Sequence, residues 1–525
     1  MEQTKTRRRR RRVRPPHLED QPTQPTAFQE AGPLTRPAFG MLDEANLEKL
    51  KTRARELVRD HGVAVVHKEA YTALVKAGAK PGATSDRLRF FDELIDEALA
   101  ATPKSTVLCG KRPERDLHLP RGDGGFVMRT GTGGHGFIEP ETSNYRNMML
   151  DDVKTIAKVA NGLDQVGFIA HPFVFGVSEL TSDIHGFASM VGRTDKHCWI
   201  QPYNKENVEF LMRIATIAAG GEDVLRKKPV ASCIVCSFSP LEFKVMDLEA
   251  MIQAGHHGMP IHACSLPTAG GTAPLSPSGL AMMAAAEILA MVTMAHVLAP
   301  GTPVIATPLM FTLDMRTGSS LQSCVESLQS AAMAIQTVKR GFGLMAHTYG
   351  AGSDTPDVDG QSLAERSLIC QTVALAGADI LGGVGQLECA TVFSPVQAVL
   401  DNELGAMLRR FIRVNDIDDE ELNWAEASQI RTGGHFLDSA HTLNRCRQQH
   451  SPDVFMREDR DNYEKINRRT AIDQARDKCM ELIKAPDPDG LPSTDALAEI
   501  AKVVADADRL ILEAAAANKG PRDEI

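Results

Sequence analysis

The sequence predicts an α/β protein, a parallel (β/α)8 barrel of the TIM type with helical extensions at both ends. The chain has 525 residues, of which 43% are hydrophobic and 24% charged, so it can bury a large core. In its centre, short apolar runs end in Gly, Pro or small polar residues and are each followed by a helical stretch. Near-continuous apolar runs of this kind are typical of parallel strands that helices cover on both faces.

Seven apolar runs of this type read as strands. They cover residues 167–173, 197–203, 230–237, 260–265, 303–309, 343–349 and 379–384. An eighth strand is needed to close a barrel, and we expect it at 126–129 or at a place that the pattern does not reveal. A barrel is favoured over an open sheet because neither GxGxxG nor GxxxxGK[ST] follows the first strands.

The chain divides into four predicted regions. They are a disordered Arg/Pro-rich tail (1–38), a helical N-terminal region (39–125), the barrel catalytic domain (126–417) and a helical C-terminal extension (418–525). Asn46 and Ser85 are expected near helix starts, and Ser394 is expected to cap a third helix. The C-terminal extension ends in an Ala-rich stretch and is expected to pack across the barrel or to mediate association.

Charge and composition exclude several classes of partner. A formal net charge of -10 offers no general reason to bind nucleic acid, and the arginines at 7–12 read as a solvated tail because Pro15 and Pro16 follow where an export signal would be apolar. The longest apolar stretch, 280–298, contains Glu287 and is expected to be a buried helix, so we expect no membrane contact. Ten cysteines without a secretory signal predict reduced thiols and a cytoplasmic protein.

Aromatic residues gather where the predicted strands end, which is where barrel enzymes place their active groups. Phe173, Trp199, Tyr203 and Tyr349 are the candidates for substrate binding, in a chain that is only 5% aromatic. Aromatic faces attract quaternary ammonium groups by roughly 0.5 to 2 kcal/mol each. The pattern therefore favours a methylated cation as ligand, although the same rings would also serve as core packing.

Five polar residues lie near the same strand ends. Asp314, His347 and Glu388 are the candidate catalytic residues, and Arg316 and Asp354 are candidates for substrate binding. These functional interpretations have structural alternatives. Asp314 and Arg316 could pair with one another and fix their loop, and His347 could simply hydrogen-bond to a neighbouring loop.

A metal site is not expected. Cys233 and Cys236 form a CxxC pattern, and His262 and Cys264 follow on the next predicted strand. Residues three apart on a strand point to opposite faces, so this CxxC cannot chelate zinc in the manner of a zinc turn. Only one of the two cysteines could join His262 and Cys264 in a metal site.

A set of short motifs in fixed order resembles the trimethylamine methyltransferase family, including its glycine-betaine-type members. The resemblance covers residues 40–463 and rests on Gly270-Gly271-Thr272-Ala273-Pro274, Leu313-Asp314-Met315-Arg316-Thr317-Gly318, Ala376-Gly377-Ala378-Asp379, Leu387-Glu388, Phe393-Ser394, Leu400-Asp401-Asn402-Glu403, Thr432-Gly433-Gly434-His435-Phe436-Leu437 and His441-Thr442-Leu443. It implies a barrel enzyme that passes a methyl group from a methylated amine to the Co(I) centre of a separate corrinoid protein. The corrinoid (cobalamin) would then belong to the partner, with no tightly bound cofactor here, and we expect a homo-oligomer.

One departure from the family bears on the substrate. Members acting on trimethylamine carry pyrrolysine near the loop equivalent to 350–359, where this chain has only ordinary residues. A quaternary amine is already activated for methyl transfer, since attack on its methyl carbon expels a neutral tertiary amine. A betaine-like substrate is therefore expected, with Arg316 or backbone amides at a helix start meeting its carboxylate. Two alternatives remain: a zinc-dependent thiol methyltransferase that uses His262 and the cysteines, and a non-catalytic protein that binds methylated amines.

Overall fold

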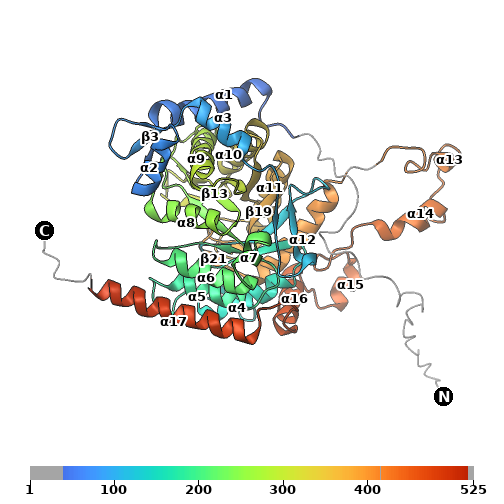
Figure 1. Ribbon diagram of the computed structural model, residues 1–525. Coiled ribbons are helices and arrows are strands. Elements are labelled where there is room, and N and C mark those ends of the chain that lie inside the picture. The colour runs from blue at the N-terminus through green and yellow to red at the C-terminus, as the bar shows by residue number, and fades with distance from the viewer. Residues whose placement is uncertain (1–38, 414–415, 518–525) are drawn as a thin grey trace, which may run out of the picture.

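A computed structural model describes residues 39–413 and 416–517, and its centre is a closed barrel of parallel strands (Figure 1). The predicted tail at 1–38 lies outside the described residues. The strands follow one another around the barrel in the order β10-β11-β13-β15-β18-β19-β6-β9. The predicted parallel (β/α)8 architecture is confirmed.

All seven predicted strands are present, with shorter ends than expected. The barrel consists of β6 (Val127–Thr130), β9 (Val166–Ala170), β10 (His197–Ile200), β11 (Ala231–Cys236), β13 (Ile261–Ser265), β15 (Val304–Pro308), β18 (Met345–Tyr349) and β19 (Ile380–Val384). The eighth strand, β6, coincides with the candidate at 126–129. It pairs with both β9 and β19 and so closes the ring.

Each barrel strand is followed by a helix that packs outside the sheet. These helices are α4 (Leu150–Asn161), α5 (Ser182–Val191), α6 (Asn207–Ala219) with α7 (Glu222–Lys227), α8 (Val245–His256), α9 (Pro277–Leu298), α10 (Val325–Gln336) continued by η4 (Thr337–Gly341), α11 (Gly360–Ala376) and α12 (Pro395–Phe411). Helix α12 starts as expected, because the Ser394 side chain accepts a hydrogen bond from the Gln397 amide.

Helix α9 is the long apolar stretch seen in the sequence. It is long and apolar enough to cross a membrane, but 78% of that apolar window is buried inside the protein. Glu287, in its middle, is fully buried and accepts hydrogen bonds from Ser237 Oγ and Ser265 Oγ, both at 2.6 Å. The expectation of a buried core helix is confirmed.

The N-terminal region combines helices with a small sheet. It holds α1 (Glu44–Glu56), η2 (Leu57–His61), α2 (Lys68–Lys76) and α3 (Asp92–Ala101), with strands β1 (Val63–Val65), β2 (Lys80–Pro81) and β3 (Arg87–Arg89), which form one sheet with β12 (Glu242–Phe243). The helix start expected at Ser85 is wrong. Residues 87–89 instead pair with β1, and α3 begins only at Asp92, because cross-strand pairing outweighs a local capping signal.

The two ends of the barrel carry different additions. At the carboxyl end lie two small sheets, formed by β14 (Thr268–Ala269), β16 (Phe311–Leu313) and β17 (Ser320–Leu321), and by β7 (Gly136–Ile138), β8 (Tyr145–Asn147), β20 (Gln386–Leu387) and β21 (Val392–Phe393). At the amino end lies a hairpin of β4 (Thr106–Leu108) and β5 (Leu117–Leu119), with the short helix η3 (Pro113–Arg115) between them.

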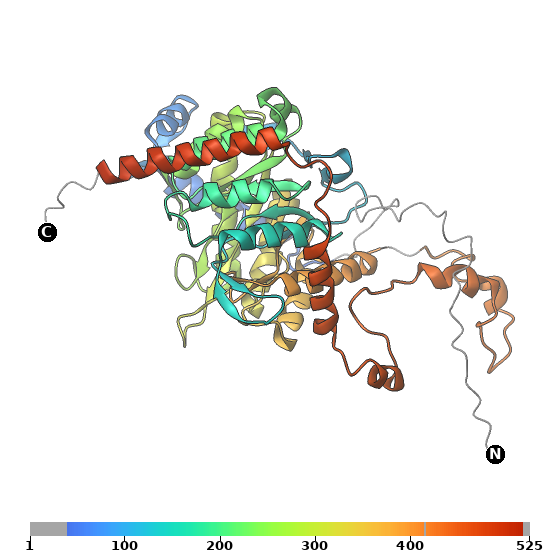
Figure 2. The same ribbon diagram turned by 90° about the horizontal axis from the view of Figure 1, so that it is seen from below.

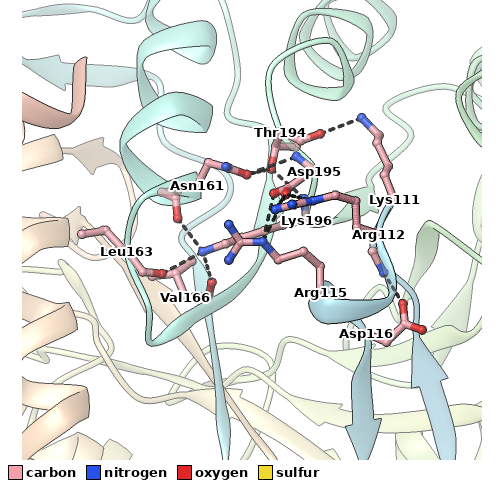
Figure 3. A network of polar contacts seen from close by, with 12 residues as sticks. Lys111, Arg112, Arg115, Asp116, Asn161, Leu163, Val166, Thr194, Asp195 and Lys196 are labelled. Atoms are coloured by element: carbon pink, nitrogen blue, oxygen red, sulfur yellow. Dashed lines mark hydrogen bonds and ion pairs between the residues drawn. The ribbon is translucent and has the colours of Figure 1, made fainter. Parts of the chain in front are cut away.

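A buried ionic network closes the amino end next to β10 (Figure 3). The Asp195 carboxylate accepts a hydrogen bond from Arg112 Nε at 2.8 Å and lies 3.1 Å from Arg115 Nε. Lys196 is also buried, and its ammonium donates to the carbonyls of Ala160 and Leu163 at 2.8 and 2.7 Å. Burial lowers the pKa of Lys196 to about 7. These contacts tie the N-terminal hairpin to the barrel floor.

The C-terminal extension has two parts. Helix α16 (Ala471–Lys484) packs on α12 and α4, and α17 (Thr494–Ala517) lies across α5 and α6 (Figure 2). Before them, α13 (Trp424–Ala427), α14 (Ala440–Arg445), η5 (Cys446–Gln448) and α15 (Arg460–Lys465) follow the barrel. Packing across the barrel, one of the two expected roles, is thus seen for α16 and α17, whereas α13 and α14 project away from it (Figure 1).

Candidate active site

Aromatic side chains follow five of the barrel strands at their carboxyl ends. They are Phe173 after β9, Tyr203 after β10, Phe238 after β11, Phe311 after β15 and Tyr349 at the end of β18. Phe173 and Tyr203 stack with ring centroids 4.3 Å apart, and Phe311 meets Tyr349 edge-on at 5.9 Å. We call these five side chains the aromatic rim.

Two members of the aromatic rim were missed by sequence reasoning. Phe238 is 55% exposed and lies two residues beyond β11. Phe311 lies three residues beyond β15. A search for every aromatic residue within a few positions of a strand end would have found both.

Trp199 lies deeper than predicted. It is fully buried inside the barrel, where its indole stacks on the His262 ring with centroids 4.5 Å apart. The centroid of the Trp199 ring also lies 6.2 Å from that of Phe168 and 5.3 Å from that of His347. Trp199, Phe168, His262 and His347 form a layer of rings inside the barrel, below the mouth, which we call the interior layer. For Trp199 this position corresponds to the core-packing alternative.

His347 belongs to the same interior layer. Its Nε2 atom accepts a hydrogen bond from Arg129 Nε at 2.9 Å. Burial, reinforced by the charge of Arg129, holds the pKa of His347 well below its usual value of 6.5. The imidazole is thus neutral near pH 7 and acts here as an acceptor that orients Arg129.

Arg129 was not among the predicted site residues, although the strand at 126–129 that contains it was predicted. The side chain is fully buried, lies with Cζ 4.2 Å from the Trp199 ring centre, and donates from Nη1 to the Thr130 carbonyl at 2.7 Å. Its Nη2 atom has no hydrogen-bond partner, and no carboxylate of the described residues pairs with it. Burial lowers the pKa of Arg129 to about 10, so the guanidinium stays positive at neutral pH.

Gly382 on β19 makes room for this guanidinium. A Cβ atom at position 382 would lie 2.9 Å from Arg129 Cζ and 2.9 Å from His347 Nε2, closer than side chains allow. An unpaired buried charge is costly, by several kcal/mol after relaxation of the protein. A guanidinium fork pairs well with anions, so the unpaired Nη2 makes Arg129 a candidate for an anion contact.

Asp314 and Arg316 lie apart from this layer, in the turn between β16 and β17. The Arg316 side chain is 91% exposed, with Nε 3.6 Å from Asp314 Oδ1. Asp314 accepts hydrogen bonds from the Arg316 amide and from Thr317 Oγ1, and these contacts lower the pKa of its carboxyl. The geometry corresponds to the loop-fixing alternative.

Asp354 fixes two loops at the mouth, and Glu388 lies in a turn that borders one of them. Asp354 accepts from the amides of Gln322 and Ser323 at 2.8 and 2.9 Å, which joins the loops after β15 and β18, and burial raises the pKa of its carboxyl. Glu388 is exposed. The predicted catalytic residues Asp314, His347 and Glu388 are therefore on three separate elements with no contact recorded among them.

The turn at Glu388 is strained. Glu388, Cys389 and Ala390 have φ values of 47, 50 and 72°, a left-handed run that side chains rarely adopt. It is held by hydrogen bonds from the Glu388 amide to the Thr355 carbonyl at 2.8 Å and from the Cys389 amide to the Ser353 carbonyl at 3.0 Å. The turn follows β19, so it lies at the carboxyl end of the barrel.

The zinc alternative finds no ligand set. Within residues 39–413 and 416–517, no group of three or more His, Cys, Asp or Glu residues could hold a metal ion. Cys236 and Cys264 are neighbours across β11 and β13, with their thiols hydrogen-bonded to each other. His262 instead lies with Nε2 3.0 Å from Ser232 Oγ.

A closed parallel barrel with its polar and aromatic side chains at the carboxyl mouth defines a (β/α)8-barrel enzyme. The model of a family described as trimethylamine methyltransferase (MTTB) matches residues 5–505. The chain belongs to this family and is a methyltransferase.

Several named proteins are similar to this chain over most of its length. Trimethylamine methyltransferase MttB of Desulfitobacterium hafniense is 24% identical over 466 residues, which cover 88% of this chain and 93% of the relative. Glycine betaine methyltransferase of D. hafniense strain Y51 is 25% identical over 435 residues, 82% of this chain and 89% of the relative. The solved monomethylamine methyltransferase (MtmB) of Methanosarcina barkeri covers 84% of this chain and 88% of its own, with 15% identity and a TM-score of 0.48.

Proposed function

We propose that this methyltransferase takes a methyl group from a betaine, a quaternary amine that carries a carboxylate, and passes it to the Co(I) centre of a separate corrinoid protein. The observation that carries the proposal is the unpaired, fully buried guanidinium of Arg129 in the barrel whose mouth bears the aromatic rim. The rim suits a trimethylammonium group, and the guanidinium suits a carboxylate.

Charge favours a zwitterion over a plain cation. A substrate without a carboxylate would bring its positive charge toward Arg129 and leave that charge unpaired. A betaine brings the missing anion with it. Arg316, the sequence-based candidate for this contact, is 91% exposed on an outer turn, so Arg129 takes its place in the proposal.

The residues of the 350–359 loop and the relatives support the same class. The loop holds only ordinary amino acids, so the proposed substrate is one whose departing amine needs no special activation. One named relative is a glycine betaine methyltransferase. When the partner docks, its corrinoid supplies the nucleophile. The C–N bond breaks with its electron pair staying on nitrogen, so the amine leaves neutral and no proton is required.

This chain's own part is then binding and orientation. The rim rings hold the ammonium at the mouth and displace water from it, which positions the methyl group toward the docked partner. Arg129 holds the carboxylate, and neutral His347 keeps the guanidinium in place through Nε. The Asp354 carboxylate and the strained turn at Glu388 fix the loops around the opening.

The test is methylation of free cob(I)alamin, followed by absorbance, with the full chain and a panel of glycine betaine, carnitine, choline and trimethylamine. A betaine is expected to react with a kcat/KM at least tenfold above that of choline, which has the same trimethylammonium group without a carboxylate. Arg129→Met is expected to lower kcat/KM for the betaine by about tenfold to 100-fold, the range for a lost charged hydrogen bond. Arg316→Gln is the matched control and should change it less than twofold.

Equal turnover of choline and betaines, or an equal loss for both in Arg129→Met, would overturn the carboxylate contact. Binding of glycine betaine by calorimetry without any methylation of cob(I)alamin would point to the binding-protein alternative.

A further inference from the structure

Three buried carboxylates at the carboxyl end of the barrel have no cation partner. They are Asp183 on α5, Asp247 on α8 and Glu287 on α9, with exposures of 0%, 6% and 0%. Within residues 39–413 and 416–517, each other buried carboxylate lies 3.4 Å or less from a Lys, Arg or His nitrogen; these are Asp152, Asp195, Asp379, Asp401 and Glu403. We call the first three the mouth carboxylates.

Glu287 is held entirely by uncharged donors. Its Oε2 atom accepts hydrogen bonds from the hydroxyls of Ser237, Ser239 and Ser265 at 2.6, 2.8 and 2.6 Å. Its Oε1 atom accepts from the Leu241 amide at 2.9 Å. Hydrogen bonds that end on both oxygens stabilise the ionised carboxylate. The negative charge is thus fixed in place, and no cation of the described residues neutralises it.

The other two mouth carboxylates hold neighbouring strand ends. Asp247 accepts from the amide of Cys236, the last residue of β11, at 2.9 Å. Asp183 accepts from the amide of Tyr203, after β10, at 2.8 Å. Burial raises the pKa of both carboxyls to about 6, so both are mostly ionised above pH 7. Negative charge therefore gathers next to two members of the aromatic rim, Tyr203 and Phe238.

An ammonium group of the chain itself already lies on this side of the mouth. Phe238 is flanked by two of the hydroxyls that donate to Glu287, and Lys244 Nζ lies 3.4 Å from the centre of the Phe238 ring. The Lys244 side chain is exposed, so it can be displaced at little cost. The Phe238 face is thus a place where an ammonium group is stabilised.

The mouth carboxylates and Arg129 lie on different sides of the barrel. In the ring, β6 and β13 are separated by three strands in either direction. Arg129 belongs to β6, and Ser265, which donates to Glu287, ends β13. A buried cation without a carboxylate partner is therefore set opposite a buried anion without a cation partner. This arrangement matches the two charges of a zwitterion.

We propose that Glu287, supported by Asp183 and Asp247, determines specificity for the ammonium group of the substrate. Its negative charge draws that group to the Phe238 face, where it replaces the Lys244 ammonium, while Arg129 holds the carboxylate. Glu287 is covered by protein and acts through its electric field, without touching the substrate. The inference rests on the proposed function, since the ligand is the same betaine, and adds a second charged determinant to it.

The test compares glycine betaine with 3,3-dimethylbutyrate, which has the same shape and carboxylate but a neutral tert-butyl group. Calorimetry measures the binding of both ligands to the full chain. Glu287→Gln keeps the size of the side chain and removes its charge. The Kd for glycine betaine is expected to rise about tenfold, and the Kd for 3,3-dimethylbutyrate should not rise. An equal rise for both ligands, as a purely structural role of Glu287 would give, would overturn the proposal.

Glu403→Gln is the matched control. Glu403 is 4% exposed and accepts hydrogen bonds from the amides of Asp453 and Val454, in the C-terminal extension, at 2.7 and 2.9 Å. Its substitution also removes one buried negative charge, but it should change neither Kd by more than about twofold. Circular dichroism establishes that the variants are folded.

A second variant changes only an exposed side chain and does not depend on how Glu287→Gln folds. Lys244→Met removes the ammonium that occupies the Phe238 face, so the Kd for glycine betaine should fall about two- to fivefold. An unchanged or higher Kd would overturn the placement of the substrate's ammonium group at Phe238.

Failure of the proposed function would give a different pattern. If Arg129 does not hold the carboxylate, Arg129→Met leaves the Kd for 3,3-dimethylbutyrate unchanged. Choline and its neutral isostere 3,3-dimethylbutan-1-ol, neither of which has a carboxylate, then test Glu287 alone, and Glu287→Gln should weaken only choline. A natural chain that binds neither cation more tightly than its neutral isostere would overturn the inference about Glu287.

Discussion

Two groups of buried charges, the network next to β10 and the interior layer around Arg129, differ in how their charges are paired. At the amino end, Asp195 is surrounded by Arg112 and Arg115, and the Lys196 ammonium donates to backbone carbonyls (Figure 3). At the level below the carboxyl mouth, the guanidinium of Arg129 has a free Nη2 and no carboxylate partner among the described residues. The network next to β10 is paired, whereas the guanidinium of Arg129 keeps one donor atom without a partner.

A third buried cation shows that the difference is not a general feature of this interior. Arg366 is fully buried like Arg129, but it lies 2.8 Å from the Asp401 carboxylate, which also accepts from the Gly385 amide. Buried charges are normally paired in this way. Arg129 and Arg409 both depart from that rule, since each has an Nη atom without a hydrogen-bond partner. Of the two, Arg129 lies on a barrel strand next to the interior layer below the aromatic rim, whereas Arg409 lies on α12. Four substitutions can break or sharpen the comparison.

The largest effect is expected for Asp195→Ala at the amino end. Removing one member of a buried ion pair leaves its cations uncompensated and typically costs about 3 to 5 kcal/mol of unfolding free energy. Denaturant unfolding measures this loss, while kcat/KM per folded molecule should not change. Asp487→Ala is the control, since Asp487 pairs with Arg193 at the surface and should cost about 1 kcal/mol or less. A loss of activity without a loss of stability in Asp195→Ala would contradict the difference between the two groups of charges.

A pH effect follows from His197, which lies at the start of β10 near the same network. It is held between the Cys109 carbonyl and Ser232 Oγ, and burial lowers its pKa to about 4. Since the unfolded chain binds this proton with a pKa near 6.5, the stability is present above pH 6.5 and lost as the pH falls toward 4, by about 3 kcal/mol in all.

Denaturation series between pH 7 and pH 4 measure this loss. The natural chain is expected to lose more unfolding free energy on acidification than His197→Asn does. Parallel curves for the two proteins would show that His197 does not titrate in this way.

In the interior layer, Gly382→Ala is expected to act mainly on the reaction. The added Cβ would meet the ends of Arg129 and His347, and overpacking of this kind costs about 1 to 3 kcal/mol. Displacement of the guanidinium should lower kcat/KM for a betaine at least tenfold while leaving choline less affected. Gly360→Ala, where an added Cβ meets nothing within 4 Å, is the matched control. Equal losses for both substrates would mean that the substitution acts through general disruption.

The smallest effect is expected for Phe173→Ala. One aromatic face contributes roughly 0.5 to 2 kcal/mol to binding a quaternary ammonium, so KM should rise by a factor of about 2 to 30. Phe173 is 37% exposed, so the unfolding free energy should change little. Tyr463→Ala on α15 serves as an aromatic control far from the barrel strands in sequence. An unchanged KM for every quaternary amine would show that Phe173 does not contribute to binding the ammonium group.

The sequence by itself determined the features that depend on local pattern. The apolar runs predicted seven barrel strands, Glu287 within an apolar stretch predicted the buried helix α9, and Ser394 predicted the start of α12. Strand alternation, helix period and capping involve residues only a few positions apart, so a single stretch of chain is enough to show them. The ordered motifs predicted the family, which the match over 5–505 confirms.

Only the tertiary structure decided which side chains form the site. Arg129 and His347 are 218 residues apart and meet because β6 closes the ring next to β19. Trp199 lies in the interior and Tyr203 at the mouth, although only four positions separate them, because depth along the barrel axis is set by strand register. The strand at 87–89 likewise exists through pairing with β1. These contacts join strands that are far apart in the sequence, and they arise only when the barrel closes. A short stretch of sequence therefore does not show them or the burial that they cause.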